Sequence, residues 1–121
     1  MANRRQTGEA GEDIARQYLR RKGYAILTSN WSTRLGELDI VAERGGVLVF
    51  VEVKTRRGAD TDAALASITP AKHERMLNAV YQYLHEHDID PDRQWRIDVI
   101  AVALRAAGPP RIDHVEDAFD W

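Results

Sequence analysis

The sequence contains no cysteine and no long hydrophobic run, and only 7% of its 121 residues are aromatic. Without cysteine, the chain cannot form a thiolate zinc site, an iron–sulfur cluster or a cysteine nucleophile. The longest apolar run, residues 47–51, is far shorter than the roughly 20 residues of a membrane-spanning helix. Residues 1–7 precede an acidic, amphipathic stretch instead of an apolar signal segment. The sequence therefore predicts a soluble protein with a cytoplasmic location and no membrane partner.

The length predicts a single domain over residues 1–121, large enough to bury a core without disulfides or a structural metal. A net charge of −2 argues against a protein that coats nucleic acid nonspecifically. The charge is unevenly distributed, because residues 1–57 hold 11 Lys/Arg and 7 Asp/Glu (+4), whereas residues 58–121 hold 6 and 12 (−6). A basic face and ordinary solvated charge both explain this distribution.

The hydrophobic pattern predicts the element order helix, three strands, helix, two strands (αβββαββ). Apolar residues at helical spacing predict a helix over 8–22 that Gly23 ends, and Thr69 with Pro70 starts a second helix that runs to about residue 87. Five strands are predicted over 24–31, 36–43, 47–55, 95–102 and 112–116. Residues 58–67 are expected to form a loop with weak helical character. The predicted class is α/β, a mixed β-sheet flanked by helices.

Gly45 and Gly46 lie between the second and third predicted strands. Two glycines favour a two-residue hairpin turn because both central residues of such a turn take positive φ. In this turn Arg44 pairs with Val47. The third strand is apolar on both faces as far as residue 51, which predicts a central position in the sheet.

The same register brings two acidic residues together across the hairpin. Counting back from the turn places Asp39 opposite Glu52 and Glu37 opposite Lys54. Opposed like charges destabilise a strand pair, and charges near a buried strand need a partner or a metal ion. Because residues two apart share one face of a strand, Glu52 and Lys54 converge with Asp39. Hard carboxylate oxygens of this kind suit Mg²⁺ or Mn²⁺.

Other interpretations of these charges stay open at this point. A surface charge ladder, in which Lys54 neutralises Asp39 and Glu52, needs no metal, and the register of a hairpin can slip by one residue. Glu12 lies on the flank of the apolar stripe of the first helix and leans toward the sheet. An exposed pair of Glu12 with Arg16 at i,i+4 spacing explains the same pattern and is favoured by it.

Several spaced segments of the chain resemble one bacterial family. These segments are GEAGE at 8–12, GELDIVA at 36–42, FVEVKTR at 50–56, RIDVIAV at 96–102 and IDHVEDAF at 112–119. They span nearly the whole chain and resemble the uncharacterised family UPF0102, the YraN-like proteins. That family in turn resembles the PD-(D/E)xK nucleases of the Holliday-junction-resolvase and RecB-like type. The resemblance implies a restriction-endonuclease-like fold.

The resemblance also implies catalytic roles by position. The motif aspartate matches Asp39, the (D/E)xK triplet runs from Glu52 to Lys54, and the first-helix glutamate of resolvase-like members matches Glu12. Leu38 stands where the motif proline is expected. The implied activity is metal-dependent, structure-selective hydrolysis of phosphodiester bonds in DNA, in repair or recombination. Asp39, Glu52 and Glu12 would hold Mg²⁺ or Mn²⁺, and Lys54 would orient the attacking water or stabilise developing charge.

The implied partner is nucleic acid, with DNA expected. Basic residues close to the site are expected to contact backbone phosphates, although ordinary solvated charge also explains them; they are Arg56, Arg57, Lys72 and Arg75. Asp98 is expected to support the fold. A noncatalytic nucleic-acid-binding accessory module, or an interaction scaffold using the acidic C-terminal half, remains an alternative function. Resolvases act as dimers, so the resemblance also suggests a homodimer. No pattern in the sequence tests this.

Overall fold

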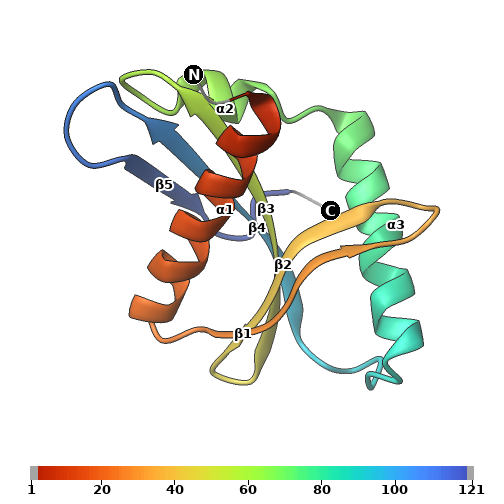
Figure 1. Ribbon diagram of the computed structural model, residues 1–121. Helices are drawn as coiled ribbons and strands as arrows, with labels where there is room; N and C mark the ends of the chain where they lie inside the picture. The colour runs from red at the N-terminus through yellow and green to blue at the C-terminus, as the bar shows by residue number, and fades with distance from the viewer. Residues whose placement is uncertain (1–2, 120–121) are drawn as a thin grey trace.

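The structure, a computed structural model, describes residues 3–119 and contains a five-stranded mixed sheet with helices on both faces (Figure 1). The helices are α1 (Arg4–Arg21), α2 (Asp62–Ala66) and α3 (Pro70–Glu86). The strands are β1 (Ala25–Ser32), β2 (Glu37–Arg44), β3 (Val47–Arg57), β4 (Trp95–Leu104) and β5 (Arg111–Val115). They lie in the order β1-β2-β3-β4-β5, with β3 and β4 parallel and the other neighbours antiparallel. The predicted α/β class with a mixed, helix-flanked sheet is confirmed.

Several element boundaries differ from the prediction, mostly by one or two residues. Helix α1 begins four residues earlier than expected, because Asn3 and Gln6 form a capping box that satisfies backbone N–H groups at the helix start. The short helix α2 forms inside the segment predicted as a loop with weak helical character. Strand β3 continues two residues beyond the predicted end, because its pairing with β4 extends to Arg57 opposite Leu104.

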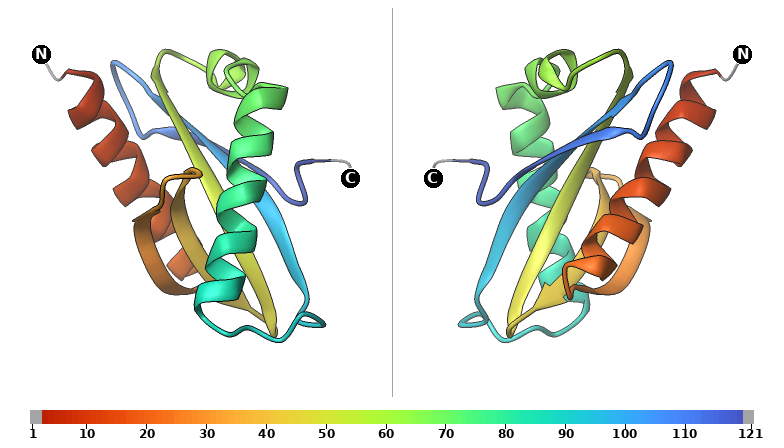
Figure 2. Two further views of the ribbon diagram at one scale, coloured as in Figure 1. Left: turned by 90° about the vertical axis from the view of Figure 1, so that its right-hand side faces the viewer. Right: turned by 90° about the vertical axis from the view of Figure 1, so that its left-hand side faces the viewer.

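Strand β3 lies at the centre of the sheet, as predicted, and sends alternate side chains to two helices. Val49 and Val51 pack in the core under α1, whereas Leu48 and Phe50 pack in the core under α3. Figure 2 shows α1 and α3 on opposite faces of the sheet. Within residues 3–119, no helix is both long and apolar enough to cross a membrane.

Two glycines let the helices approach the hairpin closely. A Cβ atom on Gly11 of α1 would lie 1.7 Å from Thr55 Oγ1 on β3. A Cβ atom on Gly36 would lie 2.6 Å from the carbonyl oxygen of Arg75 on α3. Both positions exclude a side chain unless the neighbouring element shifts. These contacts set how closely α1 and α3 flank the hairpin that carries the predicted acidic residues.

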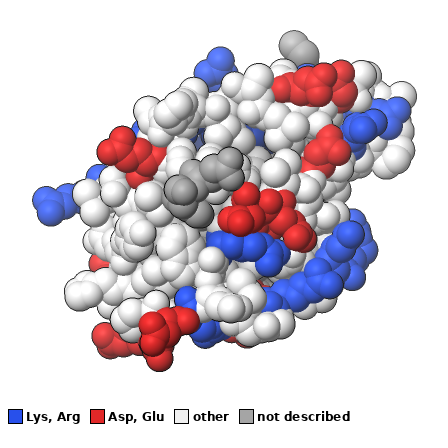
Figure 3. Space-filling model, turned by 180° about the vertical axis from the view of Figure 1, so that it is seen from behind, with Lys and Arg blue, Asp and Glu red and all other residues white. Residues whose placement is uncertain are grey.

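Helices α1 and α3 run in the direction opposite to that of the central strand β3 (Figure 1). The N-termini of α1 and α3 and the C-terminal end of β3 all lie at the upper end of the molecule in Figure 1. The positive ends of both helix dipoles therefore lie at this edge. The face that lies behind in Figure 1 carries both acidic and basic groups among uncharged surface (Figure 3). A basic face is therefore not found on that side.

Candidate active site

The predicted register of the β2–β3 hairpin is confirmed near the turn. Arg44 pairs with Val47, and the same count holds as far as Ile40 opposite Val51. The turn glycines Gly45 and Gly46 have φ of 58° and 80°, as a two-residue turn of this kind needs. In this register Asp39 is the next residue of β2, opposite Glu52.

Within the described chain, the ladder between β2 and β3 ends before it reaches the acidic residues. Asp39 Oδ2 accepts the backbone N–H of Val53 at 2.8 Å, so a side chain takes the place of the next backbone rung. The expected strand pair of Glu37 with Lys54 is therefore not formed, although both residues line a common cavity of about 120 Å³ with Glu52. The predicted meeting of Asp39 with Glu52 does occur, through a hydrogen bond between their side chains.

The surroundings of Asp39 favour its protonated form. Burial and the neighbouring Glu52 carboxylate raise the pKa of Asp39 from its ordinary value of 3.8 to about 8, although the Val53 N–H acts in the opposite direction. A hydrogen bond between two carboxyl groups requires a proton on one of them. Near neutral pH, a proton therefore holds Asp39 and Glu52 together.

Lys54 lies directly beside this pair. Its Nζ is 2.8 Å from Glu52 Oε1, and the two side chains are 18% and 19% exposed. The charge-ladder interpretation is thus realised for one carboxylate, because Lys54 neutralises Glu52. It is not realised for Asp39, whose charge is suppressed by a raised pKa. The arrangement fixes one ammonium group next to two carboxyl groups.

Helix α1 brings Glu12 to the edge of the same cluster. Burial raises the pKa of Glu12, while Arg16 and a side-chain hydrogen bond with Asn30 oppose the increase. Arg16 forms its ion pair with Asp13, and its charge also acts on Glu12. Because Glu12 is half-buried, the alternative of a fully exposed Glu12–Arg16 pair is realised only in part. The charge of Glu12 also acts on Asp39 and raises the pKa of that residue.

The acidic cluster consists of the pair Asp39 and Glu52, with the carboxyl group of Glu12 nearby. Among residues 3–119, no three His, Cys, Asp or Glu side chains form a group that could hold a metal ion. Asp39 and Glu52 nevertheless fit a hard divalent cation, because Mg²⁺ often binds one or two carboxylates and keeps several waters. Cation binding to such a pair displaces its proton. Glu12 lies outside this pair.

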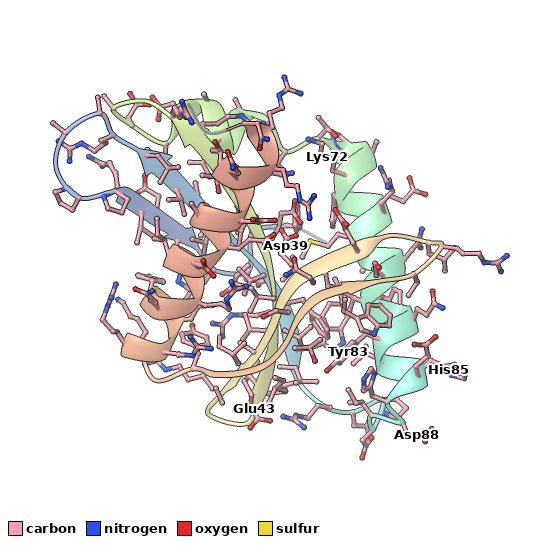
Figure 4. All side chains as sticks on the ribbon, in the orientation of Figure 1. Asp39, Glu43, Lys72, Tyr83, His85 and Asp88 are labelled. Atoms are coloured by element: carbon pink, nitrogen blue, oxygen red, sulfur yellow. The ribbon has the colours of Figure 1, made fainter. Side chains whose placement is uncertain are left out.

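The basic residues predicted near the site all line cavities at this edge of the sheet. Lys72 and Arg75 of α3 line the small cavity that also contains Lys54. Arg56 and Arg57 line a larger cleft of about 570 Å³ on the side of α1. Figure 4 shows Asp39 between α1 and α3, with Lys72 at the upper end of α3.

Several cations at this edge repel one another. The charge of Lys54 is the main cause that lowers the pKa of Lys72, and Arg56 adds to the effect. Lys72 Nζ donates to the carbonyl oxygen of Ser67 at 3.0 Å, which holds the side chain at the start of α3. An anion between these residues would relieve the repulsion.

Several lining residues of the larger cleft escaped prediction, among them three of α1. Arg4, Thr7 and Gly8 of α1 line it together with Lys54. The first helix was expected to begin at residue 8, so Arg4 and Thr7 were not placed on it, and Gly8 was not considered as a lining residue. The Asn3–Gln6 capping box was the available signal for the earlier start.

Asp98 serves the fold, as expected. Its side chain is fully buried and accepts hydrogen bonds from Arg96 Nε (2.9 Å), His114 Nε2 (2.7 Å) and the backbone N–H of Asp117 (3.0 Å). Burial alone would raise the pKa of Asp98, but the hydrogen bonds from His114 and Arg96 lower it. His114 Nδ1 in turn contacts Tyr18 OH on α1 at 3.1 Å. This network ties α1, β4 and β5 together.

Comparison with known proteins places the chain among bacterial relatives. Residues 11–102 match the family described as "Uncharacterised protein family UPF0102". A UPF0102 protein of Chloroflexus aurantiacus is 46% identical over 112 residues, covering 93% of this chain and 91% of the relative. A UPF0102 protein of Roseiflexus castenholzii is 42% identical over 97% of this chain and 95% of the relative. One from Flavobacterium psychrophilum is 39% identical over 98% of each chain.

Proposed function

The chain belongs to the uncharacterised protein family UPF0102, and we propose that it is a metal-dependent nuclease that hydrolyses phosphodiester bonds of DNA. The hydrogen-bonded pair of Asp39 and Glu52, with Lys54 beside it, carries the proposal. Holding Asp39 against Glu52 costs free energy, because Asp39 must keep a proton near neutral pH. Such a pair is explained by a ligand that neutralises it, and perturbed carboxyl groups in a basic surrounding are typical of active sites.

The pair Asp39 and Glu52 supplies the oxygen ligands for one Mg²⁺ or Mn²⁺, and Glu12 adds negative charge nearby. A divalent ion bound there neutralises phosphate charge and lowers the pKa of bound water. Lys54 is held by its ion pair with Glu52, so its ammonium is positioned to donate to a phosphate oxygen or to orient the attacking water.

The flanking cations explain how the substrate is held. Arg56, Arg57, Lys72 and Arg75 lie in the two cavities on either side of Lys54. Arginine and lysine at such positions contact phosphates and carry no base information. Because such contacts do not read bases, we expect the protein to select DNA by its shape, which suits a role in repair or recombination.

The test is cleavage of labelled single-stranded, duplex, flap and four-way-junction DNA in the presence of Mg²⁺ or Mn²⁺. We expect the wild-type protein to cleave and Glu52→Gln to lose cleavage. Glu43→Gln is a matched control, because Glu43 lies near the other end of the same hairpin (Figure 4) and pairs with Arg93. It should cleave like the wild type.

Two results would contradict the proposal that the protein is a nuclease. Equal cleavage by wild type and Glu52→Gln, purified identically, would identify a contaminant. Binding of DNA without cleavage under any of these conditions would favour a noncatalytic nucleic-acid-binding accessory module on the same fold.

A further inference from the structure

A cleft of about 570 Å³ lies between the first two turns of α1 and the end of β3. Its charged lining residues are Arg4, Glu12, Lys54, Arg56 and Arg57. Four cations thus face one acid. Lys54 also lines the small cavity of about 120 Å³ on the side of α3. The candidate active site therefore stands between a large, mainly basic cleft and a small cavity lined by the cations Lys54, Lys72 and Arg75 and the acids Glu37 and Glu52.

Gly8 gives an independent indication that the large cleft takes a ligand. It lies inside α1, where glycine destabilises a helix relative to alanine. A Cβ atom on Gly8 would meet no atom within 4 Å, whereas one on Gly11 would overlap Thr55. Packing within the chain therefore explains Gly11 and does not explain Gly8. A glycine on the wall of a cleft lets an external group approach the helix backbone closely.

The charges at the start of α1 point to an anionic ligand. The first turn contains no acidic residue and begins with Arg4, which lines the cleft and adds positive charge at the positive end of the helix dipole. The first turn of α3 also lacks an acidic residue and carries Lys72. Both helix starts lie at the same edge of the sheet (Figure 1). An anion that extends along this edge would neutralise both.

The lining of the large cleft indicates which polyanion fits. The lining residues that the structure describes include no aromatic side chain, so the cleft offers no platform for base stacking. Its volume lies in the range of small-ligand pockets and is too small for a duplex. A strand of sugar and phosphate units fits both the size and the charge.

We propose that this cleft binds the phosphate backbone of a single nucleic-acid strand, which enters beside Arg4 and Gly8, passes Lys54, and leaves through the small cavity at the start of α3. Only one part of this proposal rests on the proposed function, namely that a phosphodiester bond of the strand is cut beside Lys54. The binding itself needs no catalysis and no metal. Recognition is through phosphates, so it is independent of base sequence.

The first test measures binding of a short, fluorescently labelled single-stranded DNA in EDTA, by anisotropy over a series of salt concentrations. Arg4→Gln and Arg56→Gln should each weaken binding several-fold. Each should also lower the slope of log K against log salt by about 0.7, the value for one phosphate contact to a single strand. Arg5→Gln is the matched control, because Arg5 is the neighbour on the same helix, is paired with Glu9 and does not line the cleft. It should leave affinity and slope unchanged.

The second test fills the cleft. Gly8→Leu places a side chain where the protein itself leaves room, so we expect at least a tenfold loss of affinity with thermal stability retained or raised. Ala10→Leu is the control, because Ala10 is exposed on the same helix and does not line the cleft. It should bind like the wild type.

The results separate this path from the nuclease proposal. Equal affinity of the wild type, Arg4→Gln and Gly8→Leu would overturn the path even if the protein cleaves DNA. Lost affinity in both variants would support the path even if no cleavage occurs. A strong preference for one base sequence, or duplex binding that depends on Gly8 and exceeds single-strand binding, would also overturn it.

Discussion

Asp39 and Asp98 lie in the same sheet, Asp39 half-buried and Asp98 fully buried, yet their surroundings are opposite in charge. Asp98 accepts hydrogen bonds from Arg96, from His114 and from a backbone N–H, and its pKa is lowered. Asp39 lies against Glu52, and its pKa is raised to about 8. A buried carboxylate that serves folding is given partners by the chain itself. Under the proposed function, Asp39 has no such partners because a metal ion is to neutralise it.

The largest effect is expected from Asp39→Asn. Asparagine keeps an oxygen that accepts the Val53 N–H but removes the charge shared with Glu52. We expect the cleavage rate to fall at least ~100-fold, as for removal of one electrostatic group from a preorganised site. The free energy of unfolding should not fall. Single-turnover cleavage and urea denaturation measure both, and a wild-type rate would show that Asp39 is not part of the active site.

Asp98→Asn should act in the opposite way. It removes the charge that pairs with Arg96 and His114 inside the molecule, so the free energy of unfolding should fall by about 3 kcal/mol. The cleavage rate per folded molecule should stay within a few-fold of the wild type. Glu116→Gln is the control, because Glu116 is exposed and lies 3.8 Å from Arg96. If the stability of Asp98→Asn were unchanged, the contrast between Asp98 and Asp39 would be wrong.

Gly11→Ala tests whether the close contact between Gly11 and Thr55 determines how α1, which carries Glu12, packs against β3. The added Cβ atom overlaps Thr55, so we expect a loss of about 1–3 kcal/mol in stability. Gly8→Ala on the same helix meets no atom and should raise stability by about 1 kcal/mol. Thermal denaturation of the two variants side by side should give shifts of opposite sign. Shifts of the same sign would show that α1 is not seated through Gly11.

A dependence of stability on pH is also expected without divalent ions. Folded Asp39 keeps its proton up to about pH 8, whereas the unfolded chain releases it near pH 3.8. Between these values the folded state binds more protons, so the free energy of unfolding falls as pH rises. Urea denaturation over this range should show a flatter profile for Asp39→Asn. Identical profiles would mean that Asp39 titrates normally.

Asp98 contributes to the pH dependence of the free energy of unfolding with the opposite sign. Its lowered pKa gives stability that is present above the unfolded value of 3.8 and is lost as pH falls through the folded pKa. The two aspartates therefore act in separate pH windows. The slope between about pH 4 and pH 8 reports on Asp39 alone of this pair.

Local patterns predicted much of the fold. Thr69 and Pro70 located the start of α3, and the two turn glycines fixed the hairpin register, because caps and tight turns depend on neighbouring residues. The end of the β2–β3 ladder was not predicted. It depends on the Asp39 side chain taking the Val53 N–H, and such a replacement has no periodic pattern in the sequence.

The candidate site was predicted in part for the same reason. The register placed Asp39 next to Glu52, and the two-residue period placed Lys54 beside them. The large cleft was missed, because it arises where α1 packs on β3 through Gly11 and Thr55, which are far apart in sequence. Contacts of that kind become visible only in the folded chain.

The central claim is that Asp39 and Glu52 exchange their proton for a divalent cation. Titration calorimetry of Mn²⁺ into the protein near pH 7, in two buffers of different ionisation enthalpy, measures binding and proton release together. We expect one binding site, release of about one proton per ion, and loss of both in Asp39→Asn. Absence of Mn²⁺ binding, or binding without proton release that persists in Asp39→Asn, would contradict the account.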